Sequence, residues 1–194
     1  MTMLRNSHRL VLVALAAFAL LVAGCGSSGN ESAVDKAAKQ AAKEAKNQKP
    51  VAAAPAIQAT VVKPGSGEAD INTKPKVSKG SGNAPTALKA ETLIAGSGAA
   101  IKSGQQATVQ YVGVLFKDGS EFDTSWGKGK QPFQFALGGG QVIPGWDQGV
   151  AGMKVGERRR LTIPSDLAYG AQGSPPKIPA NAPLIFDIDL KKIG

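Results

Sequence analysis

Large apolar residues alternate with polar ones at a period of two in several parts of this chain. The clearest run is 184–191, L-I-F-D-I-D-L-K, in which every second residue from Leu184 onward is large and apolar. Residues 105–115 alternate in a similar way, and the hairpin turn signal K-D-G follows at 117–119. Because successive strand side chains point to opposite faces, such runs predict strands with one buried face. By the same criterion we predict shorter strands at 88–94, 121–124, 133–137 and 157–163.

The densest apolar stretch is 132–146, P-F-Q-F-A-L-G-G-G-Q-V-I-P-G-W, and glycine and proline divide it. The strand predicted at 133–137 ends at the glycine run 138–140, because glycine contributes no side chain to packing and tolerates any backbone conformation. A short helix is predicted at 145–151, where Trp146 lies on the same face as a valine four positions later. The stretch therefore predicts an apolar pocket that contains a tryptophan.

The predicted elements form one α+β domain, in which an antiparallel sheet packs against one short helix. We place this domain at residues 86–194. Before it, residues 26–49 contain strong helix formers but almost no large apolar residue, so a helix there has no face to bury. Residues 50–85 are rich in Ala, Gly, Pro, Lys and Ser, with room for one edge strand. We therefore predict a flexible tether and linker at 25–85.

Residues 10–23 are apolar without interruption and follow Arg5 and Arg9. A basic lead before about 14 apolar residues is typical of a secretory signal and is short for a membrane span. The sequence V-A-G-C, which ends at Cys25, resembles the bacterial lipobox, in which the cysteine is lipidated and becomes the mature N-terminus. We expect a lipoprotein signal peptide at 1–24 and a lipid anchor at Cys25, which places the protein outside the cytoplasm, on the cell membrane of a bacterial envelope. The alternative is an ordinary signal peptide followed by a chance free cysteine.

The expected cleavage limits the chemistry that the mature protein can perform. It removes His8, the only histidine, and lowers the formal net charge of +9 by two. Cys25 is the only cysteine, so lipidation would leave neither a histidine nor a free thiol. This excludes Ser-His-Asp and Cys-His nucleophilic catalysis and histidine-ligated metal sites. We expect no metal and no cofactor.

Three consecutive arginines, Arg158, Arg159 and Arg160, lie in the predicted strand 157–163. Such a run is consistent with a phosphate or nucleic-acid patch, whose affinity comes from neutralised phosphates. A lipid-anchored domain outside the membrane meets no nucleic acid, so we expect a solvated strand face and no nucleic-acid partner.

A series of blocks between residues 88 and 194 occurs in a recognisable order. The blocks are V-Q-Y-V-G-V-L, D-G-S-E-F-D-T-S, P-F-Q-F-A-L-G, V-I-P-G-W, G-V-A-G-M-K-V-G-E-R-R-R-L-T-I-P, A-Y-G and P-L-I-F-D-I-D-L. In this order and spacing they resemble the FKBP-type peptidyl-prolyl cis-trans isomerases. One block alone is weak, whereas the whole series is specific. The resemblance implies a half-barrel sheet of about five strands wrapped around one short helix, which agrees with the α+β class derived from the pattern.

The resemblance also implies which residues form the site. Trp146 is expected as the floor for the substrate proline ring, Phe186 as a wall, and Asp123 and the Tyr169 hydroxyl as polar groups at the rim; these four are the expected catalytic residues. Without the resemblance, Trp146 and Phe186 are typical core residues. The expected substrate-binding residues are Tyr111, Phe122, Phe133, Val142, Ile143 and Ile178, of which Ile143 would donate its backbone N–H to a substrate carbonyl.

The sequence departs from the family pattern in the loop after A-Y-G. Ser174 stands where many members carry a histidine, and Pro175, Pro176 and Lys177 follow it. That loop is expected to overhang the site, so the difference bears on sequence preference and inhibitor affinity more than on activity.

A site without histidine or cysteine suits prolyl isomerisation. An X–Pro bond rotates over tens to hundreds of seconds because rotation breaks amide resonance. The twisted transition state loses charge separation, so an apolar site favours it, and Asp123 would act through its field or by orienting a neighbour. We expect an isomerase for proline-containing unfolded or exported polypeptides that binds macrolide ligands and is a monomer. The alternatives are a proline-binding module or holdase chaperone without turnover, and a purely structural envelope lipoprotein.

Overall fold

The structure is a computed structural model that describes residues 57–63 and 70–194. The predicted signal peptide, Cys25 and most of the predicted tether lie outside these residues. Within them, no helix is long and apolar enough to cross a membrane.

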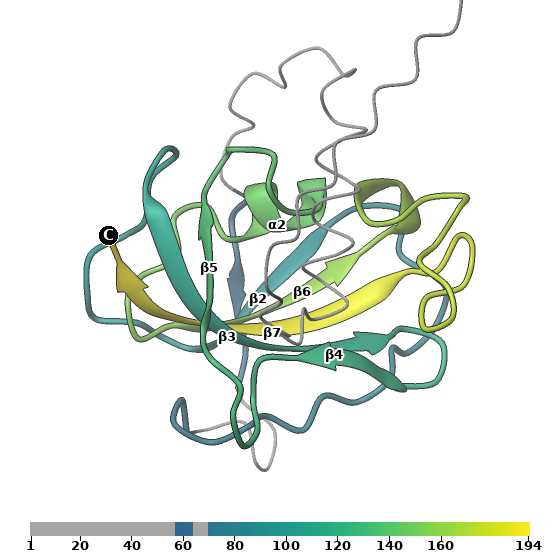
Figure 1. The fold of residues 1–194 in the computed structure, drawn as a ribbon, viewed down its shortest axis with the longest axis horizontal. Coiled ribbons are helices and arrows are strands. Elements are labelled where there is room, and N and C mark those ends of the chain that lie inside the picture. Colours follow the sequence, from purple (N-terminus) through teal and green to yellow (C-terminus); the bar gives the residue numbers. More distant parts are fainter. Residues whose placement is uncertain (1–56, 64–69) are drawn as a thin grey trace, which may run out of the picture. The chain divides into compact units, whose positions relative to one another are not determined.

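The described residues form one mixed sheet with a single α-helix packed against it (Figure 1). Its seven strands run in the order β1-β2-β6-β7-β3-β4, and β5 also pairs with β3. Only the β1–β2 pair is parallel. The elements are β1 (Thr60–Val61), β2 (Lys89–Ile94), β3 (Gln106–Leu115), β4 (Glu121–Thr124), β5 (Phe133–Ala136), α2 (Pro144–Gly149), β6 (Arg158–Ile163), the 3₁₀ turn η1 (Ser165–Leu167) and β7 (Leu184–Ile193).

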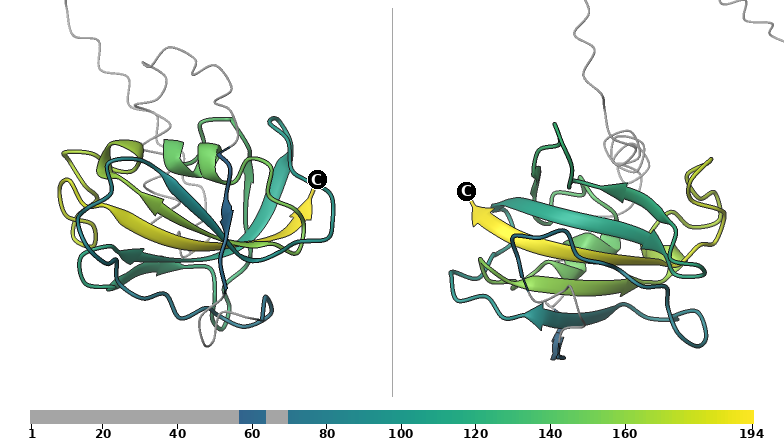
Figure 2. Two further views of the ribbon diagram at one scale, coloured as in Figure 1. Left: turned by 180° about the vertical axis from the view of Figure 1, so that it is seen from behind. Right: turned by 90° about the horizontal axis from the view of Figure 1, so that it is seen from below.

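The α+β class is confirmed, and the sheet is not closed. The two longest strands, β3 and β7, are antiparallel neighbours at its centre, with Tyr111 opposite Ile188 and Gly113 opposite Phe186. The alternation predicted from the sequence decides which side chains face α2, which lies on one face of the sheet (Figure 2). Beneath α2, β3 and β7 bury a continuous apolar core formed by Ala107, Val109, Tyr111, Leu184, Phe186, Ile188 and Leu190.

The opposite face of the sheet is also covered. Val112, Val114 and Ile185 form a second buried cluster there, and Val77 packs against it. Val77 belongs to residues 70–80, which we call the N-terminal strap. The strap lies on the opposite side of the sheet from α2 (Figure 1).

The strap is joined to the sheet by polar contacts as well. The Gly80 N–H donates to the Phe116 carbonyl at 2.8 Å, and Lys74 forms a 2.8 Å ion pair with Glu121. Further upstream, β1 supplies the edge strand for which residues 50–85 had room, and it pairs with β2. Part of the predicted linker is therefore packed against the domain.

The prediction of a solvated arginine face is wrong. Arg158 is 0% exposed and pairs with Asp189 at 2.6 Å, while Arg160 pairs with Asp187 at 2.7 Å. The cause is the sheet order: β6 lies between β2 and β7, so its outward side chains lie beside the two aspartates of β7. Buried charges occur in pairs because desolvation of a lone ion is costly.

Candidate active site

The helix that carries Trp146 lies unusually close to β6. Pro144 occupies the first turn of α2, where its missing N–H costs no hydrogen bond. A Cβ atom on Gly145 would lie 2.5 Å from Ile163, and one on Gly149 would lie 2.5 Å from Leu161. These two glycines are four residues apart, so they share the helix face that contacts the strand. This close approach places Trp146 against the sheet.

Arg159 holds the C-terminal end of the same helix. Its Nη1 donates to the carbonyl of Gly149 at 2.9 Å and to that of Ala151 at 3.2 Å. Glu157 balances its charge at 2.7 Å. The last carbonyls of a helix have no partner within the helix, and a cation satisfies them. The sequence pattern did not reveal this role, because the partner carbonyls come from a neighbouring element.

Asp147 organises the turn that precedes α2. Its carboxylate accepts the N–H groups of Gly138 at 2.8 Å and Gly140 at 3.3 Å. Both glycines have positive φ, 76° and 63°, which side-chain-bearing residues rarely adopt. Burial raises the pKa of Asp147, and the two N–H groups oppose that rise. The glycine run thus forms a fixed turn that leads into Val142 and Ile143.

Trp146 is the centre of a cluster of aromatic rings. It is 2% exposed, and its ring centroid lies 5.2 Å from that of Tyr111 and 5.2 Å from that of Phe186, both edge to face. Phe133 packs on it at 6.1 Å and Phe135 at 5.7 Å. The quadrupole of aromatic rings favours such edge-to-face arrangements. Five rings from four elements therefore meet where the sequence predicted the floor of a pocket.

The Phe186 wall extends to Phe122 because β3 carries a glycine at that point. The two rings meet edge to face at 5.4 Å. A Cβ atom on Gly113 would lie 2.6 Å from Phe186 and 2.7 Å from Phe122. Any larger residue at this position would push the two walls apart.

One of the two predicted rim groups, Asp123, acts on the other, Tyr169. Asp123, 6% exposed, accepts the Tyr111 hydroxyl at 2.7 Å and the Thr124 N–H at 2.8 Å. Burial, and secondly the charge of Asp123, raise the pKa of Tyr169 to about 12. With this raised pKa the Tyr169 hydroxyl keeps its proton. It makes no hydrogen bond with another described residue, so it is available as a donor.

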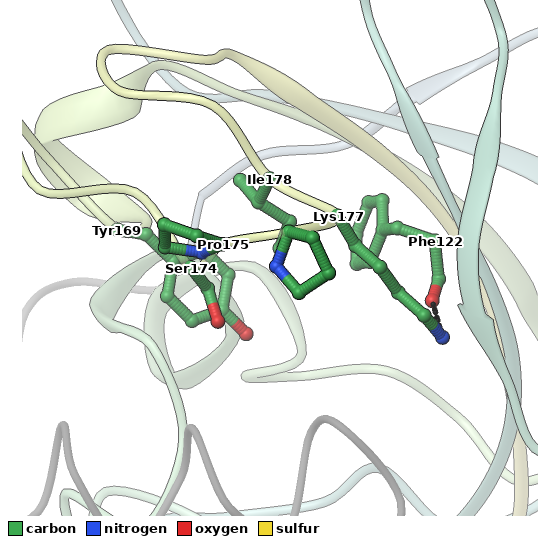
Figure 3. Close-up of a pocket in the computed structure, with 7 residues that line it drawn as sticks. Phe122, Tyr169, Ser174, Pro175, Lys177 and Ile178 are labelled. Atoms are coloured by element: carbon green, nitrogen blue, oxygen red, sulfur yellow. Dashed lines mark hydrogen bonds between the residues drawn. The ribbon is translucent and has the colours of Figure 1, made fainter.

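A cavity opens beside Tyr169 (Figure 3). Three of the predicted site residues line it, namely Phe122, Tyr169 and Ile178. The other predicted residues do not line this cavity: Trp146, Tyr111, Phe186, Asp123, Val142 and Ile143 are buried, and Phe133 is half-buried. The remaining wall is the loop formed by Ser174, Pro175, Pro176 and Lys177.

Two further donors near the aromatic cluster have no acceptor among the described residues. The Ile143 N–H, just before α2, makes no such bond, although the Ile143 carbonyl accepts from Trp146 N at 2.9 Å. The Trp146 indole Nε1 is buried and likewise unpaired. Buried donors are usually satisfied, and these two are among the exceptions in the described part of the chain.

Sequence reasoning placed Ile178, from the loop after A-Y-G, in the site but did not predict that a charged residue of this loop reaches the cavity. Lys177 does, and its Nζ donates to the Phe122 carbonyl on β4 at 2.9 Å. Its stem lies beside the prolines of the loop, while its ammonium reaches across to the neighbouring strand (Figure 3). The alternation signal could not find this residue, since the loop has no regular period.

The arrangement provides an apolar cavity, several aromatic rings and donors at its edge. No group of three or more His, Cys, Asp or Glu side chains in the described part of the chain is arranged to hold a metal ion. Such a site suits binding of an apolar ring with its flanking peptide groups hydrogen bonded.

Comparison with known proteins agrees with this geometry. The sequence model of the FKBP-type peptidyl-prolyl cis-trans isomerases matches residues 98–191. An FK506-binding protein of Streptomyces anulatus is 51% identical over 118 residues, which are 60% of this chain and 94% of that protein. FK506-binding protein 4 of Dictyostelium discoideum is 50% identical over 123 residues, 63% of this chain and 33% of that protein.

A third relative is named for the reaction. The human peptidyl-prolyl cis-trans isomerase FKBP2 is 53% identical over 92 residues, 47% of this chain and 63% of that protein. The chain thus spans less than two thirds of the human and Dictyostelium proteins but nearly all of the Streptomyces one. The chain belongs to the family of FKBP-type peptidyl-prolyl cis-trans isomerases.

Proposed function

We propose that this protein accelerates rotation about X–Pro bonds in exported polypeptides, with the proline held in an apolar aromatic site that extends from the cavity beside Tyr169 through Phe122 and Phe186 toward Trp146. Family membership supports the reaction type. The observation that carries the proposal for this site is the pairing of an apolar cavity with an unpaired Tyr169 hydroxyl at its wall.

The physical basis is a difference in polarity along the reaction. The planar imide carries charge separation, which rotation removes, so an apolar surrounding disfavours the ground state more than the twisted state. Each ~1.4 kcal/mol by which the activation free energy falls raises the rate about tenfold. Donors at the Ile143 N–H and the Tyr169 hydroxyl would hold the flanking carbonyls, so that only the bound imide rotates.

The positions of the side chains support the roles that the resemblance implies. Trp146 would support the proline ring, with Phe186 and Phe122 as walls. Asp123 already uses both carboxylate oxygens as acceptors, from Tyr111 and Thr124. It would therefore act by fixing Tyr111 and through its negative field, and not as a base.

The test is cis-to-trans conversion of the peptide Ala-Leu-Pro-Phe by the full chain in detergent. We expect a rate enhancement that Trp146→Ala and Phe186→Ala greatly reduce and that FK506 inhibits. Val61→Ser, at an exposed position on β1, should leave the rate unchanged. Absence of enhancement by a folded protein would contradict the enzymatic function.

The alternative of a proline-binding module or holdase makes a different prediction in the same experiment. A binding module would show peptide affinity that Trp146→Ala abolishes, but no rate enhancement in the unsubstituted protein. Measurement of both quantities on one preparation separates the two functions.

We further propose that the protein is a lipoprotein of a bacterial cell envelope, anchored through Cys25. The basic lead, the apolar run 10–23 and the V-A-G-C sequence support this location. In a bacterial host, the unsubstituted chain should incorporate labelled fatty acid and sediment with membranes. Cys25→Ser should abolish the label; equal labelling of both proteins would contradict the anchor.

A further inference from the structure

We propose that Lys177 gives the site a preference for peptides in which an acidic residue flanks the proline. This inference rests on the proposed function, because it assumes that the cavity beside Tyr169 receives the peptide. It concerns the loop Ser174–Ile178, where the sequence departs from the family pattern.

The loop holds Lys177 at the wall of the cavity. The Ser174 N–H donates to the Ile178 carbonyl at 2.8 Å, and the Ile178 N–H donates back to Ser174 at 3.0 Å. This reciprocal pair closes the loop and presents Pro175, Pro176 and Lys177 along the cavity. The Lys177 ammonium then reaches the Phe122 carbonyl at 2.9 Å. Its position is therefore fixed at both ends of the side chain.

Lys177 carries the only charge among the residues that line the cavity. An ammonium has three donors, and a carbonyl partner brings no compensating charge. None of the ion pairs among the described residues involves Lys177. Two donors and a full positive charge thus remain for a ligand.

The charges around the cavity are arranged asymmetrically. Figure 3 shows Tyr169 beside Ser174 and Pro175, and the Lys177 ammonium at the other end of the cavity beside Phe122. The negative charge of Asp123 acts on Tyr169, where it contributes to the raised pKa of that hydroxyl. The Lys177 ammonium is therefore the group at the cavity wall that would attract an acidic side chain of a bound peptide.

A residue next to a bound proline can reach this ammonium. Neighbouring Cα atoms are about 3.8 Å apart across a trans peptide. If the proline occupies the cavity, the side chain of the residue next to it would therefore lie at the rim of the cavity. A Glu at that point would pair with a solvent-exposed cation, for which measured coupling energies are modest. We expect a preference for Glu over Gln of about two- to fivefold in kcat/KM.

The experiment compares pairs of peptides that differ only in charge. One pair is Ala-Glu-Pro-Phe and Ala-Gln-Pro-Phe, and the other is Ala-Leu-Pro-Glu and Ala-Leu-Pro-Gln; kcat/KM and Kd are measured for each with the full chain. Lys177→Met keeps the length of the apolar stem and should bring the Glu-to-Gln ratio to about one. Lys177→Arg should retain it. Because the Lys177–Phe122 bond affects both members of a pair equally, loss of loop anchoring changes both rates but not their ratio.

The control variant is Lys192→Met, which removes the same charge from an exposed position on β7 that does not line the cavity. It should keep the Glu preference, whereas a general attraction by the positive chain would weaken in both variants. High salt should lower the ratio in the unsubstituted protein, since the pair is open to solvent. The proposal is overturned if neither pair shows a Glu preference, or if Lys192→Met removes it as fully as Lys177→Met. If no peptide is turned over, the proposed isomerase function fails, and the Kd ratios decide the role of Lys177 separately.

Discussion

The two tyrosines of this chain have different tasks at the site. Tyr111 is buried on β3 and donates its hydroxyl to Asp123, so it belongs to the framework. Tyr169 lies at the cavity wall with an unpaired hydroxyl and a pKa of about 12. A donor with so high a pKa keeps its proton throughout the physiological range.

Tyr169 should therefore titrate well above an ordinary tyrosine. Its pKa in the folded protein lies above the ordinary tyrosine value of 10.0, so folding favours the neutral hydroxyl. The resulting stability is fully present below about pH 10 and is lost as the pH rises through about 12. Near-ultraviolet absorbance of tyrosinate, recorded against Tyr169→Phe, should show this late titration in the difference curve. A difference curve centred near pH 10 would contradict the buried environment.

At the scale of the elements, β6 connects the functional helix to the outer face of the sheet. Its inward Arg159 holds the end of α2, and its outward Arg158 pairs with Asp189 on β7. Arg158 also donates to the Thr73 carbonyl of the N-terminal strap at 2.9 Å. One strand thus joins the helix, the neighbouring strand and the strap.

Arg158→Met should destabilise the protein by about 3–5 kcal/mol, because it leaves a buried carboxylate without its partner. Burial already raises the pKa of Asp189, and the Arg158 hydrogen bond and charge oppose that rise. Urea unfolding measures the loss. In a double-substitution cycle, Arg158→Met with Asp189→Leu should recover most of it; a double variant as unstable as the single one would contradict the pairing.

The regular elements could largely be predicted from the sequence, and the polar contacts could not. The strand at 121–124 was predicted with its exact bounds, and β2, β3, β5 and β6 within about one residue, because their alternation is local. The helix was expected at 145–151 and spans Pro144–Gly149. By contrast, the partners of Arg158 and Arg160 lie about 30 residues away on β7, and only the sheet order brings them together. The two aspartates within L-I-F-D-I-D-L were the available signal.

The site was predictable to a similar degree. The resemblance to the family implied that Tyr111, Phe133 and Phe186 gather around Trp146, and the structure brings their rings together. The catalytic and binding roles of those residues stay predictions. The contribution of Lys177 was not predictable, since its position depends on a loop and on a carbonyl of a distant strand.

At the scale of the whole molecule, the packed unit is larger than the region that the family model matches. That region begins at residue 98, whereas described contacts to the sheet begin near Ile57, which packs against the core. Pro75 of the strap is buried, and Val77 covers the second cluster. The strap therefore contributes to stability even though it lies outside the family match.

Removal of residues 1–85 should lower the free energy of unfolding, whereas removal of residues 1–56 should leave it nearly unchanged. The longer deletion exposes the cluster beneath Val77 and removes the partners of Glu121 and Phe116. Uncovering one half-buried apolar side chain and two polar contacts costs about 2–3 kcal/mol. Urea unfolding of the two truncated proteins measures the difference, and equal midpoints would show that residues 57–85, the strap included, add nothing to stability.

The strap also has a mechanical consequence. A pulling force applied at the N-terminal side of the chain loads the contacts in sequence order, beginning with the two-residue pairing of β1 and continuing through Lys74 and Gly80. Even with the contacts of Thr73 and Val77, these segments are held by fewer bonds than the long β3–β7 ladder, so they would yield before it. Every aromatic residue of the proposed pocket follows Gly80 in the chain. In a protein held at its N-terminus, the strap would detach from the sheet under tension before the residues of the proposed pocket are displaced.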